Sequence, residues 1–440
     1  MSAPLQIAIA LCSVLVLLGL MALLRRMAAA HHISAEMQRK LIHITTGLYA
    51  LTLPWLFPDR WPVYLLVGVT LVVMGVLRLP KVATTGLGAT LHGVERQSYG
   101  DLMLAIAIGM CMFLSGDRPW LYVLPIAILT LADAAAALAG SSYGRRFFIV
   151  GEGRKSIEGS VVFFTLSFLI SLVCLMLMTP LPPVNMLLIS AMVAGFGTMV
   201  EATSWQGFDN LFLPVGLLIF LTTHAQKDPL SLAVLAVGFA LSVLAFLSVA
   251  GRFGLTRHSA RVYVIALFLL LAATAFHNAV VPLLVLFIHV WARDANPGAG
   301  RFPDLDVVAA VALISFGSLV LGQATGWNAI SFYGAAMMGL ATGLAALALV
   351  PQPVWRRAAA LIAITAGLGL LRQWALMANP AEANWAGPLW RMVLPSLALT
   401  ALVPSLAPRH FHQRRMTKLS VLALILPLGA YLHAIATIGG

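Results

Sequence analysis

The sequence contains few charged residues. Asp, Glu, Lys and Arg make up 10% of its 440 residues, whereas ordinary soluble domains carry about 25%. Apolar residues make up 61%, so the polar groups are too few to cover the surface of a water-soluble protein of this size. This composition excludes a soluble globular protein and predicts an integral, multi-pass membrane protein.

Cysteine is also scarce. Cys12, Cys111 and Cys174 all lie in apolar stretches, which excludes a disulfide framework or a zinc site as the basis of the fold. Acidic residues number 15 against 27 Lys and Arg, a formal net charge of +12. In a soluble protein this excess would suggest nucleic-acid binding, but in a membrane protein it is typical of short loops that face one leaflet. We therefore expect a lipid membrane, and no nucleic acid, as a partner.

Long apolar runs fill most of the chain. A helix that spans a bilayer needs about 20 mostly apolar residues, and about sixteen segments meet this requirement, which predicts an all-α bundle of transmembrane helices. The first segment, 5–24, lacks a cleavage site of small residues and is interpreted as a helix rather than a signal peptide. Residues 262–291 predict two tight helices, broken near His277, Asn278 and Pro282. The other predicted segments are 42–57, 61–79, 100–115, 119–140, 159–179, 184–200, 210–223, 230–250, 306–322, 329–350, 357–375, 389–404 and 417–438.

The basic residues are divided unevenly between alternate loops. One set of loops holds most of the 27 Lys and Arg residues, and the other holds only Arg60, Arg118, Lys227, Arg372 and Arg391. Because basic loops tend to stay in the cytoplasm, this pattern predicts that the first set is cytoplasmic and that both termini lie outside.

The acidic residues are concentrated in the first half of the chain. Of the 15 acids, only Asp294, Asp304, Asp306 and Glu382 follow residue 228. Ionisable groups at membrane depth cost roughly 2.5–3.5 kcal/mol even on lenient insertion scales, so they usually mark function. The sequence therefore predicts a chemically active membrane domain over 1–228 and a second helical membrane domain of unknown role over 229–440.

Four polar clusters lie in the first half, on loops or helix ends of the predicted cytoplasmic side. In the first cluster, helical spacing places Arg39 and His43 on one face, with Lys40 beside them. A basic pair at a membrane surface is also a common topology anchor, so this cluster gains weight only from the other three.

The second cluster is an acid in an apolar helix. Asp133 lies within the run 121–139, and Ala136, Gly140 and Gly144 follow it along one stripe. Small residues at four-residue spacing let another helix or a ligand approach the backbone closely. Helix packing accounts for the small residues, but not for the carboxylate, which needs water or a cation to stay charged.

The third cluster, 151–159, combines glycines with two cations and a hydroxyl. Glycines free backbone N–H groups for phosphate oxygens, Arg154 and Lys155 would neutralise those oxygens, and the Ser156 hydroxyl would bind phosphate or metal. Walker A spacing is absent, and a basic glycine loop is often only a turn. Beside Asp133, the pattern favours a phosphate site.

The fourth cluster begins at Glu201 and reaches Asp209 and Asn210, where one predicted helix ends and the next starts. Carboxylate and amide oxygens suit Mg²⁺, which keeps several waters and shares its coordination with substrate phosphates. The alternative is a capped, solvated loop.

Together these clusters resemble the CTP-dependent polyprenol kinase family, which includes dolichol kinase, phytol kinase and diacylglycerol kinase relatives. The family pattern of an Asp, an Ala, two glycines and a basic residue is met by Asp133, Ala136, Gly140, Gly144 and Arg145.

Other family motifs occur in the same order. The family's Lys-Lys-Thr-x-Glu-Gly corresponds to 154–159, where Arg154 and Ser156 keep the charge and the hydroxyl. An early Arg-Lys-x-x-His and a late Asp-Asn-Leu-x-x-Pro are also present. The resemblance covers about 35–225, and residues 229–440 show no resemblance that suggests a role.

The resemblance implies transfer of the terminal phosphate of CTP to the hydroxyl of an isoprenoid alcohol from the bilayer, with Mg²⁺ as cofactor. Phytol, dolichol and other polyprenols fit this description, and no motif distinguishes between them or sets an oligomeric state. The implied catalytic residues are Asp133, Lys155, His43 and Glu158. The implied nucleotide-binding residues are Lys40, Gly140, Gly144, Arg145, Gly153, Arg154, Ser156 and Gly159. The implied metal ligands are Asp133, Glu201, Asp209 and Asn210.

Two other functions stay open at this point. Cytidylyl transfer, which makes a CDP-lipid and releases pyrophosphate, needs the same phosphate and metal chemistry. A transporter would suit two sets of helices, but it should carry polar groups near the midplane between related halves, whereas these clusters lie on one predicted surface. The interior polar residues of the second half are more typical of packing or interface positions: His277, Asn278, Gln323, Asn328 and Tyr333.

Overall fold

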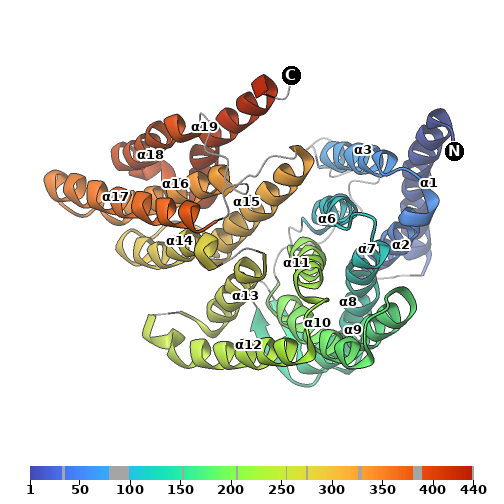
Figure 1. Cartoon of the computed structure of the whole chain (residues 1–440). Helices are drawn as coiled ribbons and strands as arrows, with labels where there is room; N and C mark the ends of the chain where they lie inside the picture. Colours follow the sequence, from blue (N-terminus) through green and yellow to red (C-terminus); the bar gives the residue numbers. More distant parts are fainter. Residues whose placement is uncertain are drawn as a thin grey trace. The chain divides into compact units, whose positions relative to one another are not determined.

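In the residues that it describes, the computed structural model is all-α apart from one short hairpin (Figure 1). It describes residues 1–31, 35–78, 99–150, 153–204, 207–253, 255–273, 276–325, 330–379 and 389–438. In this part of the chain, nine helices are long and apolar enough to cross a membrane, and shorter apolar helices of 10–17 residues accompany them. The protein is an integral, multi-pass membrane protein, as its composition predicts.

The chain forms two compact units, Met1–Leu241 and Ser242–Gly440. The division falls inside helix α12 (Pro229–Val249), somewhat beyond residue 228, where the acidic residues become sparse. Helix α12 is the least buried of the long helices, and its aliphatic side chains, such as Leu230 and Val234, are exposed. Such an apolar, exposed surface is what a helix presents to lipid.

The first unit is built around a buried helix. Nearly every side chain of α11 from Asn210 to Leu221 is buried, and α11 contacts α6, α7 and α10. A helix that is apolar on all sides belongs in a core. The bounds are α1 (Ala3–Ala30), α2 (Ala35–Leu56), α3 (Trp61–Leu77), α6 (Gly100–Leu114), α7 (Pro119–Ala127), α8 (Asp133–Tyr143), β1 (Phe147–Val150), β2 (Gly153–Ser156), α9 (Ile157–Met178), α10 (Pro183–Thr203) and α11 (Asp209–His224).

The second unit has α16 at its centre. This helix, Ile330–Ala348, contacts α14, α15, α17, α18 and α19, and its side chains from Ala335 to Ala348 are almost all buried. The other bounds are α13 (Arg257–Ala273), α14 (Phe276–Ala295), α15 (Pro303–Thr325), α17 (Val354–Ala378), α18 (Leu389–Leu406) and α19 (Arg415–Ile438), with short 3₁₀ turns at Ala250–Phe253 and Pro408–Phe411.

Residues 262–291 form two helices, α13 and α14, as their length predicts. The break precedes His277, and Pro282 lies inside α14, where a proline removes only one backbone hydrogen bond that neighbouring groups can replace. His277 Nε2 lies 2.8 Å from Asn379 Oδ1, and Asn278 exchanges amide hydrogen bonds with Asn379 at 2.9 and 3.1 Å. These side chains therefore join α14 to the end of α17. Of the other interior polar candidates, Tyr333 is buried, Gln323 is exposed rather than interior, and Asn328 lies outside the described residues.

Candidate active site

Asp133 begins α8 directly after a π-helical turn, Ile128–Ala132, which joins α7 and α8 into one continuous helix. In this wider turn the Asp133 N–H bonds to the Ile128 carbonyl, five residues earlier. Such a turn rotates the following side chains around the helix axis and is frequent at functional sites. It places the Asp133 carboxylate, 6% exposed, against α2.

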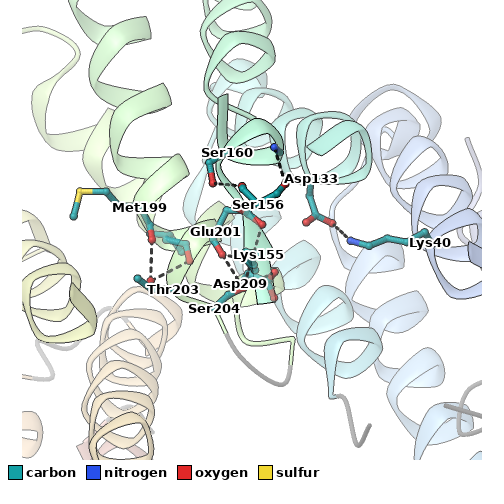
Figure 2. Close-up of polar contacts among 12 residues, drawn as sticks. Lys40, Asp133, Lys155, Ser156, Ser160, Met199, Glu201, Thr203, Ser204 and Asp209 are labelled. Atoms are coloured by element: carbon teal, nitrogen blue, oxygen red, sulfur yellow. Dashed lines mark hydrogen bonds and ion pairs between the residues drawn. The ribbon is translucent and has the colours of Figure 1, made fainter. Parts of the chain in front are cut away.

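Helix α2 brings two basic side chains to Asp133. Lys40 Nζ donates a hydrogen bond to Asp133 Oδ2 at 2.8 Å (Figure 2). His43 Nε2 lies 3.9 Å from the same oxygen. The helices approach closely because Gly47 has no side chain: a Cβ there would collide with Thr130 of the π-helical turn. The structure thus brings the first and second sequence clusters together.

Strand β2 brings Lys155 to the end of α10. Its ammonium donates to Glu201 Oε1 at 2.5 Å, to Ser204 Oγ at 3.0 Å and to the Glu201 carbonyl. Ser204 Oγ in turn donates to Asp209 Oδ2 at 3.1 Å (Figure 2). The third and fourth clusters therefore also meet, and Ser204, which was not singled out from the sequence, connects them. The sequence feature that could have identified Ser204 is a hydroxyl residue between two acids, Glu201 and Asp209, at the end of a predicted helix.

The two ion pairs form one electrostatic site. The charge of Lys155 acts on Asp133, in addition to that of Lys40. Asp133 and Asp209 both act on Glu201. Figure 2 shows the Lys40–Asp133 pair beside the group around Lys155. The result is a buried set of alternating positive and negative groups, an arrangement suited to a substrate that carries phosphate charge.

The expected glycine loop at 151–159 is largely a hairpin. Strands β1 and β2 pair antiparallel, with Phe147 opposite Ser156, and residues 151–152 between them lie outside the described part. Successive side chains of a strand point to opposite faces. Lys155 therefore turns toward Glu201, whereas Arg154 is exposed and lies 5.0 Å from the centre of the Phe147 ring. The two cations expected to share one phosphate group thus lie on different faces.

The small residues of the motifs bring α8 and α9 together. Ser156 is buried and caps α9, accepting a hydrogen bond from the Gly159 N–H at 3.0 Å. A Cβ on Gly159 would lie 2.8 Å from the Ala136 carbonyl oxygen and 3.4 Å from the Gly140 Cα. Gly144 is similarly close to Phe147 and Ser156. This placement gives the glycines and Ser156 a packing role, and direct contact with a nucleotide stays a prediction.

The remaining motif residues lie around the site. Glu158 accepts hydrogen bonds from the Arg146 N–H at 3.2 and 3.4 Å, which ties the start of α9 to the hairpin. Arg145 is exposed, and Gly153 is partly buried in β2. Asn210 is buried and donates to the Gly100 carbonyl at 2.7 Å, so it anchors α6 to α11.

The site has donors of the kind that Mg²⁺ prefers. Asp133, Glu201 and Asp209 supply carboxylate oxygens from α8, α10 and α11. Among the described residues, however, no three or more His, Cys, Asp or Glu side chains form a group that could hold a metal ion. Lys40 donates a hydrogen bond to one carboxylate oxygen of Asp133, and Lys155 donates one to a carboxylate oxygen of Glu201. The donors therefore fit an ion that arrives with nucleotide phosphates and is held by one or two carboxylates, rather than a resident ion in a protein cage.

Comparison with known proteins connects this geometry to a family. No family model matches the chain, and no solved structure matches it. A phytol kinase of Synechocystis sp. is 34% identical over 186 residues, which cover 41% of this chain and 76% of that enzyme. Through this part of its length, the protein belongs to the phytol/polyprenol kinase family.

Proposed function

We propose that this protein is a membrane-embedded prenyl alcohol kinase that transfers the terminal phosphate of CTP to the hydroxyl of an isoprenoid alcohol. One observation carries the proposal: two lysine–carboxylate pairs, Lys40–Asp133 and Lys155–Glu201, lie in one buried electrostatic site. The similarity to a phytol kinase supports the same class of acceptor.

The reaction balances without a covalent enzyme intermediate. The alcohol oxygen attacks the terminal phosphorus of the nucleotide, the bond from this phosphorus to the bridging oxygen breaks, and CDP leaves. The hydroxyl proton passes to a base, which we assign to Nδ1 of His43. Its Nε2 faces the Leu129 carbonyl and the Asp133 carboxylate, both acceptors, so Nε2 carries the ring proton and Nδ1 has the free lone pair. Phosphoryl transfer depends mainly on positioning and charge stabilisation, which the surrounding groups provide.

The ion pairs suggest how the nucleotide is accommodated. Lys40 and Lys155 would exchange their carboxylate partners for phosphate oxygens. An ammonium group forms charge-assisted hydrogen bonds with both acceptors, and these bonds are of similar strength. One or two carboxylates would hold Mg²⁺, drawn from Asp133 and Glu201, which are released in this way, and from Asp209 beside Ser204. When bound, Mg²⁺ would neutralise charge on the phosphates. We assign Glu158 to positioning the hairpin, and Asn210 to positioning α6.

The side of the membrane follows from the basic loops. In the topology predicted from the sequence, these loops lie on the same side as the site motifs, and we assign that side to the cytoplasm by the positive-inside rule. CTP would therefore enter from the cytoplasm, while the alcohol enters from the bilayer.

A transfer assay tests the proposal. The full chain in membranes is given γ-labelled CTP or ATP and a panel of phytol, geranylgeraniol, dolichol and diacylglycerol, with phosphatidic acid as the acceptor for cytidylyl transfer. We expect label in a prenyl monophosphate, and CDP as the second product. Asp117→Asn is a matched control, because Asp117 is fully exposed and pairs with Arg60. Formation of a CDP-lipid with labelled pyrophosphate would instead establish cytidylyl transfer, and absence of label from every lipid would contradict the kinase.

A further inference from the structure

A largely apolar cavity lies beside the site in the first unit, and the mechanism above does not use it. It encloses about 1170 Å³ of space, part of which is open to the surface. Its walls come from α1, α2, α3 and α6, with Asn210 of α11 at one end. Most of the lining side chains are aliphatic, so the cavity is suited to a hydrocarbon rather than to a nucleotide.

The cavity has one polar end. Arg39 and His43 of α2 and Asp101 of α6 line it there, near the charged ends of these helices. Asp101 pairs with Arg78, and its Oδ2 is buried without a hydrogen-bond partner in the described part of the chain. A hydroxyl group at this end would therefore find both donors and acceptors.

The other end is apolar. Further along the same helices the lining consists of Ala50 and Leu53 of α2, Val14 of α1, Leu66 of α3 and Ile108 of α6. From His43 to Leu53 an α-helix rises by about 15 Å, at 1.5 Å per residue. The cavity thus extends from the charged site to a depth comparable with half of the hydrocarbon core of a bilayer.

We infer that this cavity binds the hydrocarbon tail of the alcohol, with the hydroxyl at the end lined by His43. The inference rests on the proposed function. A molecule with one polar end and a long apolar tail matches the lining, and His43 belongs to both the cavity and the charged site, since its Nε2 is 3.9 Å from Asp133 Oδ2. A tail held here would bring its hydroxyl to the phosphate-binding groups.

Two adjacent valines of α3 provide a matched test. Val73 lines the cavity, whereas Val72 is 66% exposed and does not line it. In the full chain, Val73→Trp should raise the KM for phytol about tenfold or more, because it fills space that the tail needs. The KM for the nucleotide should stay within about twofold, and Val72→Trp should leave both values unchanged. Equal effects of the two substitutions would overturn the cavity assignment.

A second variant tests the depth of the cavity. Ala50→Leu narrows the apolar end, so it should impair the long prenols phytol and geranylgeraniol more than the short prenol geraniol. A uniform loss for all chain lengths would contradict binding of the tail along this axis. Nucleotide binding by each variant shows whether it has folded.

Photolabelling separates this inference from the proposed function. A phytol analogue with a photoreactive group at the tail end should label peptides of α1, α2, α3 or α6 in the wild type, and labelling should fall in Val73→Trp but not in Val72→Trp. This result does not require turnover. If the wild type transfers phosphate but labels elsewhere, the cavity assignment fails and the kinase stands. If it labels here but phosphorylates no prenol with any nucleotide, the proposed function fails and the tail site stands.

Discussion

Both units bury an acid beside basic groups, but they satisfy its hydrogen-bonding capacity differently. In the second unit, Asp304 Oδ2 accepts a hydrogen bond from the Ser259 hydroxyl at 2.7 Å, and Oδ1 lies 3.0 Å from His289 Nε2. Arg293 Nη1 donates to both oxygens of Asp304, at 3.1 and 3.2 Å. In the first unit, the side-chain hydrogen bond of Asp133 uses Oδ2 and comes from a single lysine.

The difference indicates which buried acid is suited to chemistry. The network around Asp304 joins α13, α14 and α15 and occupies both carboxylate oxygens, so it is suited to holding helices together. At Asp133, the hydrogen bond to Oδ2 comes from one lysine, and a cavity lies next to the neighbouring histidine. Burial of a charged pair is therefore weak evidence of a site. Remaining bonding capacity beside a cavity is the more specific sign.

The largest expected effect is the loss of activity in Asp133→Asn. The substitution keeps the size of the side chain and removes the charge that the two basic neighbours face. Loss of a preorganised electrostatic group at a reacting centre typically lowers kcat by about 100-fold or more. Transfer of labelled phosphate to phytol, normalised to folded and membrane-inserted protein, measures it. A variant with near-normal turnover would remove Asp133 from the site.

Asp304→Asn should have the opposite profile. Breaking a buried ion pair by removing one partner costs about 3 kcal/mol, so the variant should unfold at a lower temperature in detergent. Phosphate transfer per folded molecule should be unchanged. If activity fell while thermal stability was kept, the second unit would hold part of the chemistry, and the contrast between the two acids would not stand.

Lys155→Ala should raise the KM for the nucleotide by roughly tenfold to a hundredfold, because a charge-assisted hydrogen bond is worth about 1.5–3 kcal/mol. The KM for the alcohol should change little. Arg154→Ala is the matched control: Arg154 precedes Lys155 in the same strand but lies over Phe147, so its loss should affect the nucleotide KM weakly. Equal effects on both substrates in Lys155→Ala would show that Lys155 only holds the hairpin.

The smallest effect concerns the packing of α8 on α9. Gly159→Ala should destabilise the protein by about 1 kcal/mol or somewhat more, because its Cβ would press on the Ala136 carbonyl. Gly195→Ala in α10 is the control, since a Cβ there meets nothing within 4 Å and alanine is the better helix former. Thermal unfolding of both variants measures the difference. A nucleotide KM raised in Gly159→Ala without loss of stability would favour direct contact with phosphate instead.

The distribution of apolar residues determined the fold class. Each spanning helix satisfies its own backbone hydrogen bonds, so a local run of apolar residues is enough to predict it. The apolar run 262–291 is too long for one crossing, and this length alone predicted the two helices α13 and α14. The motifs likewise predicted candidate site residues such as Lys40, Asp133 and Lys155, because each motif is a set of side chains at fixed spacing along the chain.

The tertiary structure alone decided which of these residues meet. Lys40 and Asp133 are 93 positions apart, and Lys155 and Glu201 are 46 apart, so no local pattern could pair them. The opposite directions of Arg154 and Lys155 depend on a strand that the glycine-rich motif did not predict. The Asp304 network and the apolar cavity each combine side chains from three or more helices. Local periodicity reports which face of a helix is apolar, but the partner of that face is set by packing between distant segments.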